Sequence, residues 1–81
     1  MSNRPAEVPA NGNIQIVVNG EPRDVPQGFN LEQLLGFLEV NPDRVAIERN
    51  LEIVRKPEWT GTQVVAGDRL EVVWFVGGGR A

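Results

Sequence analysis

The chain has 81 residues, which allows one small domain with a single hydrophobic core but leaves too little chain for a deep substrate cavity. Its net charge is −3 and its eight basic residues are scattered, so the clustered Lys and Arg of a nucleic-acid-binding surface are missing. It has no Cys or His, which excludes disulfides, a thiolate metal site and Ser–His or Cys–His nucleophile pairs. Without a long apolar run or a signal-peptide core, we expect a soluble, cytoplasmic protein that uses neither metal nor bound cofactor and is not an enzyme.

The amino-terminal part predicts a disordered leader followed by a hairpin. Residues 1–13 are polar and without periodicity, which is typical of disorder. Residues 14–18 are largely β-branched and predict a strand, and Asn19-Gly20 is a strong signal for a two-residue hairpin turn. The return strand then covers residues 21–25. Because Pro22 has no N–H to donate, this strand is expected at a sheet edge.

A short amphipathic helix is predicted next, over residues 31–39. Asn30 is a favourable N-cap, and Gln33 lies three residues further on, where it completes a capping box. Leucines follow at the i, i+3, i+4 and i+7 spacing of one helix face: Leu31, Leu34, Leu35 and Leu38. Gly36 weakens this helix by about 1 kcal/mol relative to Ala, so packing against the rest of the domain must stabilise it.

The second half of the chain predicts three more strands. Residues 45–48 and 51–54 form a pair around a turn at Arg49-Asn50, where Asn50 tolerates a left-handed conformation. A single helical turn starting at Pro57 and a brief extended segment at residues 62–65 come next. Residues 69–76 form the long last strand.

This order of elements predicts an α+β fold of two layers. Its simplest closure places the first and last strands side by side and parallel, in a mixed sheet of four to five strands, with one main helix packed on one face. That arrangement is the β-grasp, or ubiquitin-like, fold. We expect one such domain over residues 14–76, followed by a flexible glycine-rich tail at residues 77–81.

The glycine run Gly77-Gly78-Gly79 is the most informative feature of the sequence. A tail without Cβ atoms can enter a slot too narrow for any side chain, and the run lacks the GK[ST] signature and following helix of a phosphate loop. Since strand residues alternate between faces, Val73 and Phe75 point outward if Leu70 and Val72 point toward the helix. We therefore predict a partner-binding surface beside the tail, formed by Val73, Trp74, Phe75, Val76 and Gly77.

Residues 14–79 resemble the ThiS family of sulfur-carrier proteins of thiamin (thiazole) biosynthesis. The resemblance rests on Val18-Asn19-Gly20-Glu21, on residues 45–54 (VAIERNLEIV) with Glu58-Trp59, and on residues 67–79 (GDRLEVVWFVGGG). A β-grasp domain with a diglycine end is also shared by MoaD-like carriers and ubiquitin-like modifiers. The Glu48-Arg49-Asn50 segment and the Phe75-Val76 pair before the glycines favour the ThiS family.

The resemblance implies a chemical role for the terminal glycines. A ThiF-like enzyme would use ATP to adenylate the carboxylate of Gly79, the last residue of the Gly78-Gly79 pair, and a sulfur donor protein would convert it to a thiocarboxylate. A ThiG-like thiazole synthase would take up the sulfur. Arg80 and Ala81 follow Gly79 in this sequence, so we expect a protease to remove them first.

Three other functions stay open on the sequence. One is a MoaD-like or tRNA-thiolation sulfur carrier, which differs from the ThiS reading only in its partners. Another is a ubiquitin-like modifier attached to lysines, for which the single Lys56 limits self-conjugation. The third is a noncovalent β-grasp adaptor whose tail has no role.

Overall fold

The computed structural model describes residues 12–75, which contain five strands, one α-helix and two 3-10 helices. In chain order these are β1 (Asn13–Val18), β2 (Glu21–Pro26), α1 (Leu31–Phe37), η1 (Pro42–Arg44), β3 (Val45–Arg49), β4 (Glu52–Val54), η2 (Lys56–Gly61) and β5 (Arg69–Trp74). Residues 1–11 of the predicted leader and the predicted glycine tail lie outside the described residues, as does Val76 of the predicted last strand. The leader was predicted to extend to residue 13, but Asn13 is already the first residue of β1.

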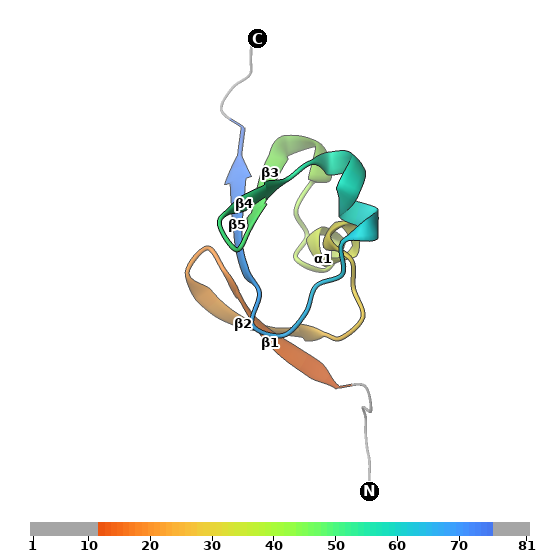
Figure 1. The fold of residues 1–81 in the computed structure, drawn as a ribbon, viewed down its shortest axis with the longest axis vertical. Coiled ribbons are helices and arrows are strands. Elements are labelled where there is room, and N and C mark those ends of the chain that lie inside the picture. The colour runs from red at the N-terminus through yellow and green to blue at the C-terminus, as the bar shows by residue number, and fades with distance from the viewer. Residues whose placement is uncertain (1–11, 76–81) are drawn as a thin grey trace, which may run out of the picture.

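The strands form one mixed sheet in the order β2-β1-β5-β3-β4. β1 and β5 are parallel neighbours at its centre, while the β1–β2, β3–β5 and β3–β4 pairs are antiparallel. α1 lies on one side of this sheet (Figure 1). The β-grasp prediction is therefore confirmed, including the edge position of β2. At this edge the missing N–H of Pro22 interrupts no hydrogen bond of the sheet.

Both predicted hairpin turns form, and the second lies one residue later than predicted, at Asn50-Leu51. Asn19 and Gly20 have φ values of 51° and 83°, as a two-residue turn of the favoured hand requires. Asn50 has the predicted left-handed conformation with φ 52°, but Leu51 shares it with φ 75°. The prediction that the fourth strand begins at residue 51 is therefore wrong, because Leu51 is the second central residue of the turn and β4 begins at Glu52.

The capping box at the start of α1 is confirmed. Asn30 Oδ1 accepts a hydrogen bond from the Gln33 N–H at 2.7 Å, and Gln33 Oε1 accepts one from the Asn30 N–H at 2.9 Å. The helix ends at Phe37, two residues before the predicted end. Glu39 takes a left-handed conformation with φ 62°, and the Val40 N–H donates to the Leu35 carbonyl at 2.9 Å, which closes the helix in a Schellman motif.

The core lies between α1 and the face of the sheet that it covers. Its buried side chains come from α1, from η2 and the segment after it, and from every strand except β4: Ile16, Val18, Val25, Leu31, Leu34, Leu35, Val45, Ile47, Trp59, Val64, Leu70 and Val72. Fully burying a side chain of the Val or Leu type contributes about 1.5–3 kcal/mol relative to exposure, which offsets the weak intrinsic propensity of the short, Gly36-containing helix.

Trp59 is the core residue that the sequence pattern did not reveal. It belongs to the predicted helical turn, which the structure extends to the six-residue η2. Its side chain is 2% exposed, and its Nε1–H donates to the Val54 carbonyl at 2.8 Å. η2 therefore closes one side of the core and satisfies the carbonyl at the end of β4.

Candidate functional site

The end of β5 alternates between the two faces of the sheet as predicted. Leu70 and Val72 are 2% and 5% exposed and point into the core, whereas Val73 and Phe75 are 51% and 62% exposed. Trp74 has the same parity as Val72 but is 51% exposed. α1 ends at Phe37, so it does not cover Trp74, and the Trp74 side chain borders a groove together with Leu38 and Val40. Both aromatic side chains of the segment are therefore available to a partner.

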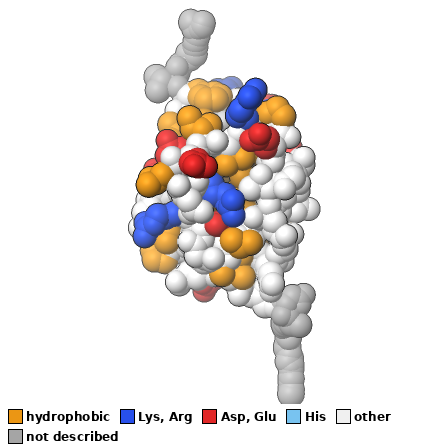
Figure 2. All heavy atoms as spheres, in the orientation of Figure 1, with side chains coloured by type: hydrophobic (Ala, Val, Ile, Leu, Met, Phe, Trp, Pro, Cys, Tyr) orange, Lys and Arg blue, Asp and Glu red, His pale blue; other side chains and the backbone are white. Residues whose placement is uncertain are grey.

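Val73 and Phe75 belong to an apolar surface on the uncovered side of the sheet. Ala46 of β3 is paired with Val73, and a shallow groove brings Phe75 together with Ala46 and with Ile53 of β4, which is 69% exposed. We call Ala46, Ile53, Val73 and Phe75 the outer apolar surface. Figure 2 shows one face of the molecule, on which exposed hydrophobic side chains lie among charged ones. A contiguous surface of this kind is typical of a site that binds another protein.

Two acidic side chains border the outer apolar surface. Glu48 is paired with Ile53 across β3 and β4 and with Glu71 across β3 and β5, so both carboxylates share the face of Val73. Glu48 is partly buried, whereas Glu52 at the start of β4 is exposed. A partner that covers this face therefore meets an apolar surface with a negative border.

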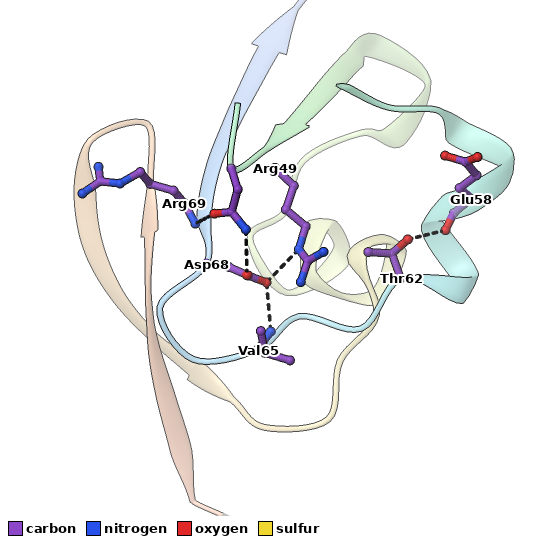
Figure 3. A network of polar contacts seen from close by, with 7 residues as sticks. Arg49, Glu58, Thr62, Val65, Asp68 and Arg69 are labelled. Carbon is purple, nitrogen blue, oxygen red and sulfur yellow. Dashed lines mark hydrogen bonds and ion pairs between the residues drawn. The ribbon is translucent and has the colours of Figure 1, made fainter. Parts of the chain in front are cut away.

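The base of β5 is fixed by a buried carboxylate (Figure 3). The Asp68 side chain is 3% exposed and accepts hydrogen bonds from Arg49 Nε at 3.1 Å and from the Val65 N–H at 2.9 Å. Asn50 Nδ2 lies 3.4 Å from Asp68 Oδ1, and Asn50 Oδ1 accepts from the Arg69 N–H at 3.0 Å. Three donors around one buried carboxylate offset the cost of removing it from water.

This cluster unites two segments that carried the family resemblance, Arg49-Asn50 and Asp68-Arg69. They are separated by 19 residues in the Arg49–Asp68 pair. The sequence predicted a turn at Arg49-Asn50 and a strand that begins at Arg69, and it did not reveal their contact. Their position at the start of β5 makes them the support of the strand that leads to the glycines, rather than part of a reacting centre.

Asn19 stabilises β5 further along. Its main-chain N–H donates to the Leu70 carbonyl at 2.9 Å, which continues the β1–β5 pairing. Its side-chain amide then replaces a missing peptide group: Oδ1 accepts from the Val72 N–H at 2.7 Å and Nδ2 donates to the Val72 carbonyl at 3.3 Å. The hairpin residue predicted only as a turn former therefore also holds the exit strand in place.

Of the residues predicted to form the site, the structure describes Val73, Trp74 and Phe75 and places them at the exit of β5. The predicted Val76, the glycines Gly77, Gly78 and Gly79, and the predicted processing residues Arg80 and Ala81 lie outside the described residues. The profile of the ThiS family matches residues 11–79, which is most of the chain. The chain belongs to the ThiS family.

Solved and curated relatives of this ThiS-family chain agree with that assignment. The crystal structure of the thiamine biosynthesis protein ThiS from Geobacter metallireducens superposes with a TM-score of 0.72 at 33% identity, covering 82% of this chain and all (100%) of that one. The uncharacterized protein ycf40 of Porphyra purpurea is 36% identical over 69 residues, which are 85% of this chain and 97% of that protein.

A third relative is much longer than this chain. The thiazole synthase of Paramagnetospirillum magneticum is 47% identical over 66 residues, which are 82% of this chain but 20% of that protein. This ThiS-family chain therefore spans about a fifth of the length of the thiazole synthase that it matches. The family assignment supports a sulfur-carrier role.

Titratable groups of the ThiS-family chain add structural pairs rather than a reacting centre. Between residues 12 and 75, no three acidic side chains gather where they could hold a metal ion. In the same stretch, no helix has the length and hydropathy needed to cross a membrane.

The pKa of Asp43 is lowered, first by its hydrogen bond with Lys56 and then by the charge of that ammonium group. This pair connects η1 to η2 at the surface.

Proposed function

We propose that this protein carries sulfur as a thiocarboxylate on Gly79, for the formation of the thiazole of thiamin. The observation that carries the proposal is the extent of the ThiS-family match, which runs through Gly78 and Gly79 and stops before Arg80. The resemblance of the β5 region and the exposed outer apolar surface beside it support the same role.

The chemistry requires activation of the carboxylate by a separate enzyme. The Gly79 carboxylate attacks the α-phosphorus of ATP on a ThiF-like enzyme, so that pyrophosphate leaves and an acyl-adenylate forms. A protein persulfide then attacks the acyl carbon and displaces AMP, and a thiol reduces the resulting acyl disulfide to the thiocarboxylate. We place these steps in the cytoplasm, where ATP is the available co-substrate.

The domain supplies the binding energy that the glycines lack. Three extended residues span about 10 Å, and ordering each costs about 1–2 kcal/mol of backbone entropy without side-chain contacts in return. The outer apolar surface, with Val73 and Phe75 at least half exposed, offers such contacts next to the tail. We therefore propose it as the docking surface for the adenylating enzyme.

We propose a thiazole synthase as the acceptor of the sulfur. The supporting observation is the 47% identity between this chain and one fifth of a thiazole synthase. A carrier and its acceptor must meet in every turnover, and a shared chain would raise their effective concentration. We further propose that a protease removes Arg80 and Ala81, because Gly79 has a free carboxylate only after the bond to Arg80 is cut.

The test compares the 81-residue chain with a form ending at Gly79. Each is incubated with the ThiF-like enzyme of the same host, ATP, a persulfide donor and a thiol, and its intact mass is measured. We expect the Gly79 form to gain one sulfur in exchange for one oxygen, and a form lacking Gly79 to remain unchanged. An unchanged Gly79 form, or a thiocarboxylate formed on Ala81, would contradict the proposal.

A further inference from the structure

β5 extends beyond the strand that pairs with it on one side. β1 is in register with β5 only at Val17–Arg69 and Val18–Leu70, after which the chain turns away at Asn19-Gly20. The Asn19 amide completes the next position by pairing with the main chain of Val72. The next residue of the same parity is Trp74, and beside it β1 offers no further residue.

The register shows which way the main chain of Trp74 points. The Phe75 N–H donates to the Arg44 carbonyl, and the Asn50 N–H donates to the Arg69 carbonyl, so the odd-numbered residues of β5 bond toward β3. Leu70 and Val72 bond toward β1 and Asn19. Trp74 has the parity of Leu70 and Val72, so it directs its N–H and carbonyl toward the β1 side of β5. No described residue bonds to either group there.

A groove of about 440 Å³ lies against this open edge. Its apolar wall consists of Val18, Leu38, Val40, Val72 and Trp74, and its charged border consists of Glu21, Arg23 and Glu39. An unpaired strand edge beside an apolar groove has the two features by which an extended peptide is bound: main-chain hydrogen bonds along the edge, and a pocket for alternate side chains.

We propose that the edge at Trp74 receives an extended segment of the adenylating enzyme, which adds to the sheet next to β5. This inference rests on the proposed function, because that function brings the enzyme to the residues that follow Phe75. Gly79 is five residues beyond Trp74, so a strand that pairs with Trp74 lies next to the last described residues before the reacting carboxylate. The added strand aligns the tail, while the groove accepts one of its apolar side chains.

The sharpest test removes the main-chain donor without changing any side chain. The form ending at Gly79 is made by chemical synthesis with an N-methyl group on the amide of Trp74. Its matched control carries the N-methyl group on Asp24 of the edge strand β2. The Asp24 N–H points away from β1, because Val17 and Asn19 bond toward β5 and leave Ile16–Arg23 and Val18–Glu21 as the bonded pairs of the β1–β2 hairpin. Thermal unfolding of both forms, compared with that of the full chain, verifies that they fold.

We expect N-methyl-Trp74 to bind the ThiF-like enzyme at least about tenfold more weakly than the control, because the methyl group removes one hydrogen bond and blocks the approach of a strand. Equal binding of the two forms, while the unmodified form is still adenylated, would overturn this inference and leave the proposed function intact. Absence of adenylation of the unmodified form would overturn both.

Amide hydrogen exchange provides a second readout that does not need a variant. The Trp74 amide of the unmodified form should exchange rapidly in the free protein and at least about tenfold more slowly in the complex. Protection in the free protein would show that the chain's own segment covers the edge. Protection that rises with protein concentration would assign the edge to a second copy. Either result, or unchanged exchange in the complex, would overturn the inference.

Discussion

Arg49 Nε lies 3.1 Å from Asp68 Oδ2, and this contact joins the β3–β4 turn to the start of β5. The carboxylate is 3% exposed, whereas the Arg49 side chain is 29% exposed. The pair is thus asymmetric: the acid is enclosed by donors and the base reaches water. Such an arrangement makes Asp68 the residue on which the local geometry depends, since its loss leaves buried donors without partners.

Replacing Asp68 should destabilise the fold. In Asp68→Ala, the Val65 N–H and the Asn50 amide lose their acceptor, and Arg49 loses its counter-charge. We expect a loss of about 2–4 kcal/mol in the free energy of unfolding, measured by chemical denaturation. The control Asp24→Ala, at an exposed position, should change it by less than about 0.5 kcal/mol. Equal effects of the two substitutions would contradict a structural role for the cluster.

The two tryptophans should differ sharply in their contribution to stability. Trp59→Phe leaves the Val54 carbonyl without its donor and creates a small cavity, so we expect a loss of about 1–3 kcal/mol in denaturant unfolding. Trp74→Phe, at a half-exposed position, should cost less than about 1 kcal/mol. Trp59 is the tryptophan that remains in Trp74→Phe, and its emission maximum should lie at a shorter wavelength than that of an indole in water. Emission typical of a solvated indole would show that Trp59 is not in the core.

The Asp43–Lys56 pair gives a pH dependence of known sign. The folded-state pKa of Asp43 is below its ordinary value of about 3.9, so the pair's contribution is complete above that value and is lost as the pH falls through the lower, folded-state pKa. The Asp43 carboxylate is fully exposed, so salt should weaken the effect. NMR titration should place the Asp43 midpoint below that of an unpaired Asp, and Lys56→Met should raise it. An unmoved midpoint in Lys56→Met would rule out the pair as the cause.

Docking through the outer apolar surface predicts a kinetic effect without a change in fold. Val73→Asp should raise the KM for adenylation of the Gly79-ending form about tenfold, because it places a charge at the centre of the contact, while the midpoint of unfolding should change little. The matched control is Leu51→Asp, since Leu51 is 86% exposed in the turn between β3 and β4. A KM for Val73→Asp equal to that of Leu51→Asp would place the docking contact elsewhere.

Local signals were enough to predict the element order and the sheet. The leucine spacing, the capping box at Asn30 and the Asn19-Gly20 turn each depend on residues a few positions apart, which a sequence displays directly. The alternation along β5 followed from the same short-range logic. Because these signals agreed with one another, the β-grasp arrangement and the outward orientation of Val73 and Phe75 could be predicted.

The remaining features depend on contacts between distant segments. The role of Asp68 becomes visible only when the fold brings Arg49 and Asn50 to its carboxylate. The role of Trp59 becomes visible only when the Val54 carbonyl lies at its ring nitrogen. Trp74 has the parity of a core residue, yet it is half exposed because the helix ends at Phe37. The left-handed Glu39 that ends the helix carries no glycine signal, so the helix end was predicted too late.

The parallel neighbours β1 and β5 are the first and last strands of the domain, so the start of β1 and the end of β5 lie at opposite ends of the sheet (Figure 1). Tension applied between the two ends of the chain therefore loads the hydrogen bonds from Val17 to Asp68 and from Asn19 to Leu70 in shear, all at the same moment, instead of opening them one after another. An enzyme that draws the carboxyl end into a narrow channel would pull along β5, parallel to the strand that holds it at the centre of the sheet.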